Sequence, residues 1–149
     1  MCELLGASLN KAVSVNDYLT EFFSHSVRHP HGWGLLRESC GKMELIKEKL
    51  SAGESELAAK AVRTTQPQKT FLAHIRYATV GSTQYANCHP FYAKDNSGRV
   101  WVFIHNGTLY SDRKVLQYAE FQEGNTDSER AFLYLIDKVN EKLYQTKKI

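Results

Sequence analysis

Cysteine, proline and long apolar runs are all scarce in this sequence of 149 residues. The three cysteines, Cys2, Cys40 and Cys88, show no paired spacing, which argues against a disulfide framework and favours a reducing, cytoplasmic setting. No apolar run approaches the roughly 18 residues of a membrane-spanning helix, and no basic-then-apolar leader is present. We therefore expect neither a membrane anchor nor a secretory signal.

Neither positive nor negative charge is in large excess. The net charge is +3, and the Lys and Arg residues are scattered except for a short basic end at 142–148. No basic stripe is interleaved with aromatic residues, so we expect no nucleic acid partner. Neither Cys-x-x-Cys nor His-Glu-x-x-His occurs, and we expect no metal and no other cofactor. The composition, 42% hydrophobic and 23% charged, is that of one globular domain.

The spacing of apolar residues predicts a mixed α and β domain. Strands are expected over 3–9, where the strand should be buried, and over 35–38, 42–47, 71–78 and 99–105. Helices are expected over 14–28, 55–63, 111–119 and 128–143. A capping box of Ser14 and Asp17 should open the first helix, and the segments 10–14 and 79–91 should be loops.

Cys2 directly follows Met1, which is a rare place for a thiol. Removal of Met1 would leave a thiol and a free α-amine on the same Cα. A thiol has a pKa of about 8.5 and an α-amine one of about 7.7–8.0, so the amine suits the role of base for the sulfur nucleophile. The alternative is that Cys2 is a small apolar residue at the start of a strand.

Other polar residues lie at the ends of predicted strands and in the loops that follow, where folded sheets present active groups. Each also has a structural explanation. Arg76 can pair with a surface carboxylate, Asn106-Gly107 is a common hairpin turn, and Asp127 suits the start of a helix. The remaining histidines of interest are expected to be partly buried with satisfied hydrogen bonds: His74, His89 and His105.

Taken as an ordered set, six segments resemble the class II glutamine amidotransferase domain, a family of N-terminal-nucleophile hydrolases. The segments are Met1–Gly6, His31–Gly34, Ala73–Gly81, Asn87–Phe91, Phe103–Leu109 and Thr126–Glu129. The resemblance implies one such domain over 1–149, with an α+β fold that is a four-layer α-β-β-α sandwich of two mostly antiparallel sheets. Relatives continue with further strands, so we expect an incomplete C-terminal end and, with it, either pairing with another chain, such as a second copy, or reduced stability.

The resemblance also implies roles for individual residues. Cys2 would attack the side-chain amide of glutamine, forming a γ-glutamyl thioester that is hydrolysed to glutamate after ammonia leaves. Asn106 and Gly107 would form the oxyanion hole. Arg76 would hold the α-carboxylate of the substrate and Asp127 its α-ammonium group. Further residues would line or order the same pocket: Tyr77, Thr79, Gly81 and His89.

Three functions stay open at this point. The first is glutamine hydrolysis, with or without an ammonia-accepting partner protein. The second is hydrolysis of another γ-glutamyl amide or peptide, because the two clamping charges grip only the α end of the substrate. The third is a non-catalytic glutamine-binding subunit. Sugar-amidating relatives often carry a histidine where this chain has Val80, which argues against sugar-phosphate amination.

Overall fold

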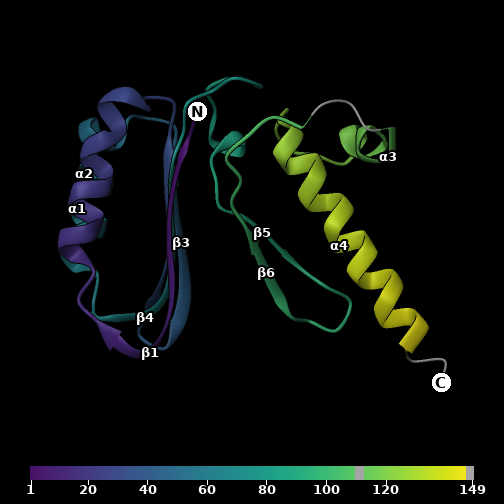
Figure 1. Cartoon of the computed structure of the whole chain (residues 1–149), viewed down its shortest axis with the longest axis horizontal. Coiled ribbons are helices and arrows are strands. Elements are labelled where there is room, and N and C mark those ends of the chain that lie inside the picture. The colour runs from purple at the N-terminus through teal and green to yellow at the C-terminus, as the bar shows by residue number, and fades with distance from the viewer. Residues whose placement is uncertain (110–112, 147–149) are drawn as a thin grey trace.

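A computed structural model describes residues 1–109 and 113–146 (Figure 1). The strands are β1 (Glu3–Val13), β2 (Trp33–Ser39), β3 (Lys42–Glu48), β4 (Gln68–Ile75), β5 (Phe91–Lys94) and β6 (Val100–Phe103). The α-helices are α1 (Asn16–Ser24), α2 (Glu56–Thr64), α3 (Arg113–Leu116) and α4 (Asp127–Thr146). Short 3-10 helices are η1 (His25–Arg28), η2 (Ala52–Glu54), η3 (Tyr85–Asn87) and η4 (Gln117–Glu120). The expected α+β class with two antiparallel sheets is confirmed.

The larger sheet has the strand order β1-β4-β2-β3, and every neighbouring pair is antiparallel. Its register places Ile75, the last residue of β4, between Glu3 of β1 and Trp33 of β2. Residues just before Glu3 and just after Ile75 therefore meet at one end of the sheet. This is the end at which the N-terminus lies in Figure 1.

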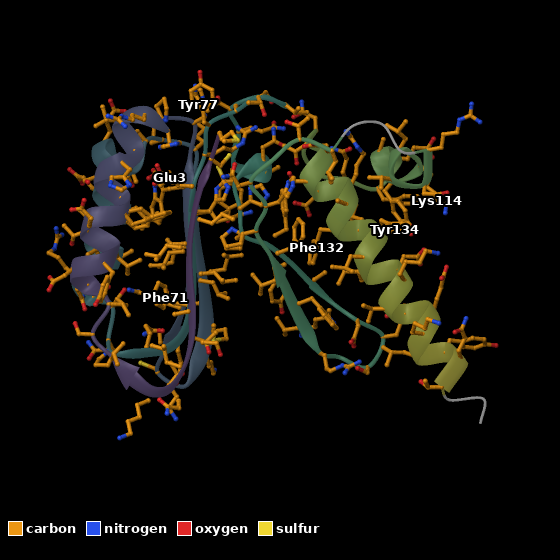
Figure 2. The ribbon with its side chains drawn as sticks, in the orientation of Figure 1. Glu3, Phe71, Tyr77, Lys114, Phe132 and Tyr134 are labelled. Atoms are coloured by element: carbon orange, nitrogen blue, oxygen red, sulfur yellow. The ribbon has the colours of Figure 1, made fainter. Side chains whose placement is uncertain are left out.

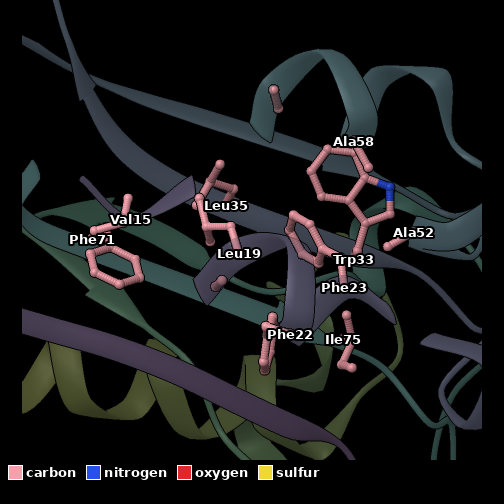
Figure 3. Close-up of a cluster of buried hydrophobic side chains, with 12 residues drawn as sticks. Val15, Leu19, Phe22, Phe23, Trp33, Leu35, Ala52, Ala58, Phe71 and Ile75 are labelled. Atoms are coloured by element: carbon pink, nitrogen blue, oxygen red, sulfur yellow. The ribbon is translucent and has the colours of Figure 1, made fainter. Parts of the chain in front are cut away.

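One face of the larger sheet packs against α1 and α2 (Figures 1 and 3). Alternate residues of the strands point to this face, as the two-residue period of a strand requires. Trp33 is fully buried between the sheet and these helices. Its ring makes an edge-to-face contact with Phe23, with ring centroids 5.3 Å apart. Twelve buried residues form the cluster: Val15, Leu19, Phe22, Phe23, Trp33, Leu35, Ala52, Ala58, Ala61, Phe71, Ala73 and Ile75.

The second sheet is the β5–β6 hairpin, which lies between the larger sheet and α4 in Figure 1. Phe132 of α4 is buried against it and stacks on Phe91 and Phe103 at centroid distances of 6.4 and 5.5 Å. Figure 2 shows Phe132 on the side of α4 that faces the hairpin. No helix in the ranges 1–109 and 113–146 is both long enough and apolar enough to cross a membrane.

The two halves of the chain meet at the same end of the sheet as the N-terminus. A Cβ atom added to Gly34 would overlap the backbone carbonyl of His89, so only glycine permits this approach. Lys47 of β3 donates a hydrogen bond of 2.9 Å to the carbonyl of Cys88. Toward the other end of the sheet, the hairpin and the larger sheet diverge (Figure 1).

Several local expectations need correction. Segment 10–13 belongs to β1 rather than to a loop, and β1 is not a buried strand, because it forms an edge of the sheet. Helix α1 has Val15 at its N-cap position with no side-chain cap, so the expected capping box is absent. Strand β5 was not expected: it begins at Phe91, the last residue of the expected loop, and continues to Lys94. Of the expected helix over 111–119, the positions 111 and 112 lie outside the described residues.

Candidate active site

Cys2 and Arg76 are brought together by the pairing of β1 with β4. Cys2 immediately precedes Glu3 and Arg76 immediately follows Ile75, the partner of Glu3 in the register. The sulfur of Cys2 accepts a hydrogen bond of 3.4 Å from the backbone N–H of Tyr77 and lies 3.5 Å from its carbonyl oxygen. Tyr77 is at the top of the sheet in Figure 2. Cys2 is only partly buried, so its sulfur is within reach of a ligand.

A cavity of about 530 Å³ is lined by both Cys2 and Asn106. Asn106 follows strand β6 and is thus far from Cys2 in the sequence. The rest of the wall comes from the start of β1 and from α1 and η1, including Tyr18, Phe22 and His25. The structure therefore places a thiol and a side-chain amide at one cavity, which is the arrangement that a nucleophile and an oxyanion donor need. Gly107 follows directly, close to the ring of His105.

The same cavity has a charged wall that the sequence patterns did not reveal. Nδ1 of His25 lies 2.8 Å from Glu3, and its Nε2 lies 3.4 Å from Glu21. The hydrogen bond to Glu3 is the main cause that raises the pKa of His25 above its ordinary value, with Glu21 adding to it. His29 lies 3.7 Å from the other oxygen of Glu3. The four-residue spacing of Glu21 and His25 on a helix was the one available signal.

Arg76 is buried, with 3% of its surface exposed, and its guanidinium contacts backbone carbonyls rather than a carboxylate. It donates to the carbonyls of Val80 at 2.8 Å, Ser82 at 3.0 Å and Gly81 at 3.4 Å. These bonds use at most three of its five N–H groups, so at least two have no protein acceptor among the described residues. Burial lowers the pKa of Arg76, while Cys88, Cys2 and Asp127 act in the opposite direction.

Asp127 is buried at the first turn of α4, with its carboxylate in use. It accepts hydrogen bonds of 2.6 Å from the N–H of Leu109 and 2.9 Å from the N–H of Ser128. The helix cap is Thr126, whose hydroxyl accepts from the N–H of Glu129 at 3.2 Å. Asp127 thus ties the segment after Asn106-Gly107 to α4. Its charge lies close enough to Arg76 to affect the pKa of that residue.

The remaining residues proposed from the sequence lie around these groups. The hydroxyl of Thr79 is 3.5 Å from that of Thr108. Gly81 has a φ of +79°, and a Cβ there would lie 2.7 Å from the side-chain oxygen of Asn125. Neither residue lines the cavity at Cys2, nor do Arg76, Tyr77 or Asp127. The structure thus places the thiol at a cavity on the α1 side and next to the end of β4, which Arg76 directly follows.

His89 and His74 differ from what the sequence predicts. Both are fully buried between the sheets, and no ring nitrogen of either has a hydrogen-bond partner in the described part of the chain. Their rings are in contact, tilted by 39° with centroids 4.3 Å apart. Burial lowers the pKa of His74 to about 3 and holds that of His89 well below its ordinary value. His105 alone meets the expectation, with a bond of 3.0 Å to Ser128.

The other two cysteines are set apart from Cys2 by their surroundings. Cys88 is fully buried, and its thiol donates to the carbonyl of Glu48 at 3.3 Å. Burial raises the pKa of Cys88, which keeps its thiol protonated. Cys40 is exposed in the turn between β2 and β3. Within the described ranges, no three His, Cys, Asp or Glu side chains gather in a way that would hold a metal ion.

Comparison with known families shows which family the chain belongs to. The family described as class-II glutamine amidotransferases matches the chain over residues 1–149. The chain therefore belongs to the class II glutamine amidotransferases, and the family predicted from the sequence is confirmed.

Three relatives show how the chain compares with longer proteins. A Methanocaldococcus jannaschii protein named "Uncharacterized protein MJ1515" is 41% identical over 145 residues, which are 95% of this chain and 40% of that protein. "Putative glutamine amidotransferase YafJ" of Escherichia coli is 31% identical over 98% of this chain and 58% of its own length. A Haemophilus influenzae protein named "Putative glutamine amidotransferase" is 29% identical over 92% and 47%. The chain spans about half the length of these curated relatives.

Proposed function

We propose that the chain is a glutamine-hydrolysing domain whose nucleophile is Cys2. The observation that carries the proposal is that Cys2 and Asn106, about a hundred residues apart, line one cavity while Arg76 lies beside Cys2 in the β1–β4 register. We take α1 and α2, the larger sheet, the hairpin and α4 to be the four layers of an N-terminal-nucleophile hydrolase sandwich. Their order in Figure 1 supports this assignment.

In the proposed reaction, removal of Met1 frees the α-amine of Cys2. The amine takes the thiol proton as the sulfur attacks the carboxamide carbon, and it then delivers the proton to the departing nitrogen. A C–S bond forms, the C–N bond breaks and ammonia leaves. Water then cleaves the thioester, giving glutamate and restoring the thiol.

Asn106 and Gly107 would stabilise the oxyanion of the tetrahedral intermediates, through the side-chain amide and the backbone N–H respectively. The N–H groups of Arg76 that have no acceptor among the described residues suit the α-carboxylate of the substrate. Asp127 would face the α-ammonium group. Residues around the α-amino-acid end of the substrate would be Tyr77, Thr79 and Gly81. The buried ring of His89 would hold this part of the site in place.

The test is ammonia release from L-glutamine by protein whose N-terminus has been sequenced. We expect active protein to begin at Cys2, and we expect Cys2→Ala to lose activity while Cys40→Ala, a matched change at an exposed thiol, retains it. A glutamine-mimicking electrophile should add its mass to Cys2 alone. Unchanged ammonia release by Cys2→Ala would overturn the mechanism. Tight glutamine binding without turnover by processed protein would favour a binding subunit instead.

The cavity at Cys2 favours a second candidate, a hydrolase of larger γ-glutamyl amides. Arg76 and Asp127 do not line this cavity, so a substrate held by them at its α end would direct its amide nitrogen toward the cavity. A volume of about 530 Å³ exceeds what ammonia needs. Comparing kcat/KM for L-glutamine with that for γ-glutamyl methylamide and a γ-glutamyl dipeptide separates the two candidates.

A further inference from the structure

Asn87 is a fully buried residue at the end of η3, and both polar atoms of its side chain are hydrogen-bonded. Its side-chain nitrogen donates to the carbonyl of Ser82 at 2.7 Å and to the side-chain oxygen of Asn125 at 2.6 Å. Its side-chain oxygen accepts from the backbone N–H of Asn125 at 2.9 Å. The side-chain oxygen of Asn125 also accepts from the N–H of Ser82 at 3.1 Å. Two asparagines thus bind two chain segments to each other.

These two segments are the ones that hold the charges at the α end of the proposed substrate site. The first, 80–82, supplies the carbonyls that orient the guanidinium of Arg76. The carbonyl of Ser82 accepts from both Arg76 and Asn87. The second segment, 124–126, leads directly into Asp127. A single side chain therefore connects the supports of both charges.

The glycines on either side show that this contact requires close backbone approach. A Cβ at Gly124 would overlap the side-chain oxygen of Asn87, and one at Gly81 would lie 2.7 Å from the side-chain oxygen of Asn125. Glu129 holds the second segment from its other side, accepting from the N–H groups of Glu123 at 2.7 Å and Gly124 at 2.9 Å. The second segment is therefore fixed independently of any ligand.

We propose that Asn87 is a positioning residue that sets the placement of Arg76 relative to Asp127 and thereby the affinity for the amino-acid end of the substrate. The inference rests on the proposed function for the identity of the substrate. Asparagine is required because Ser82 and Asn125 present acceptors to the side-chain nitrogen, while Asn125 presents a donor to the oxygen. Aspartate at this position would face those two acceptors with a carboxylate oxygen.

The experiment compares Asn87→Asp with Asn16→Asp as a matched control. Asn16 also bridges two elements by donating to backbone carbonyls, those of Val62 at 2.6 Å and Thr65 at 3.1 Å, but it lies far from the site. We expect Asn87→Asp to raise KM for L-glutamine by about 10–100-fold, because a shift of segment 80–82 weakens the hydrogen bonds between the substrate and the charged side chains of Arg76 and Asp127. The kcat of the variant should stay within about threefold of that of the unaltered chain. Asn16→Asp should leave both constants unchanged. A rise in KM of equal size in both variants, or a loss confined to kcat, overturns the assignment.

Asn125→Ala provides a second route should Asn87→Asp fold poorly. It should raise KM to a similar extent, and the double variant Asn87→Ala, Asn125→Ala should add little, because both remove the same link. Additive effects would contradict the shared role.

Binding separates this inference from the proposed function. In a Cys2→Ala background, calorimetry of L-glutamine should show Kd weakened 10–100-fold by Asn87→Asp. Weakened binding without any Cys2-dependent turnover upholds the positioning role and refutes hydrolysis. Turnover with unchanged KM in Asn87→Asp does the reverse. Absence of L-glutamine binding by both the Cys2→Ala and the unaltered chain overturns both.

Discussion

His74 should make the folded state sensitive to acid. Its ring is buried against His89, and neither of its nitrogens has a hydrogen-bond partner among the described residues. Its pKa is about 3 in the folded protein because burial disfavours the charged ring. This effect and the charge of Arg76, which acts in the same direction, outweigh the nearby backbone of His105, which acts against them. The unfolded chain takes up this proton near its ordinary pKa of 6.5. Stability is therefore lost as pH falls from about 6.5 toward 3.

The magnitude follows from that interval. At pH 5 the unfolded histidine is 1.5 pH units below its pKa, and each unit corresponds to about 1.4 kcal/mol, so His74 alone removes about 2 kcal/mol of unfolding free energy between pH 7 and pH 5. His89, whose pKa is also lowered, adds a loss of the same sign. For a domain of this size, such a loss is a large part of the total stability.

The assay is urea unfolding at pH 7 and pH 5, followed by the fluorescence of Trp33 and Trp101. In His74→Leu, the difference in unfolding free energy between the two pH values should shrink by about 2 kcal/mol, whatever the change in packing does to the absolute values. His25→Ala is the control, because the pKa of His25 is raised and its contribution has the opposite sign. An unchanged pH difference in His74→Leu would refute the reasoning.

Three further predictions concern packing and catalysis. Gly34→Ala places a methyl group against the carbonyl of His89 and should cost about 1–3 kcal/mol in urea unfolding; an unchanged midpoint would show that the contact yields freely. Asn106→Ala should lower kcat for L-glutamine by about 10²–10³-fold with little change in KM, and steady-state kinetics showing only a KM effect would remove it from the oxyanion hole. Phe132→Ala, which removes the ring stacked on Phe103, should lower the free energy of unfolding by about 3–5 kcal/mol. A loss below about 1 kcal/mol would contradict the central place of Phe132 in the cluster between α4 and the β5–β6 hairpin.

The sequence patterns predicted the elements that are formed by contacts between residues close together in the chain. The β2–β3 hairpin appears where the sequence places it, as does α2 with Ser55 accepting from the N–H of Ala58 at its start. Strand β5 was missed because its four residues form a strand only by pairing with β6. Tyr18 of α1 is exposed although it is aromatic, because it borders the cavity beside the edge strand β1.

The candidate site shows the same division. The motif residues Cys2, Arg76 and Asn106 were identifiable because each chemical group suits a role in one reaction. Their meeting at one end of the sheet depends on strand register, and no spacing along the chain encodes it. The role of Asn87 was hidden for the same reason, although it lies in one of the matched segments, because its partners are contacts made across the fold.

The contact between Gly34 and His89 has a mechanical consequence. It joins the two sheets near the nucleophile, while the sheets separate toward the opposite end (Figure 1). If one sheet rotated relative to the other, the contact would lie at the axis of rotation, and the displacement of backbone atoms would grow with their distance from it. Any such rotation would therefore move the open end more than the sulfur and the groups around it.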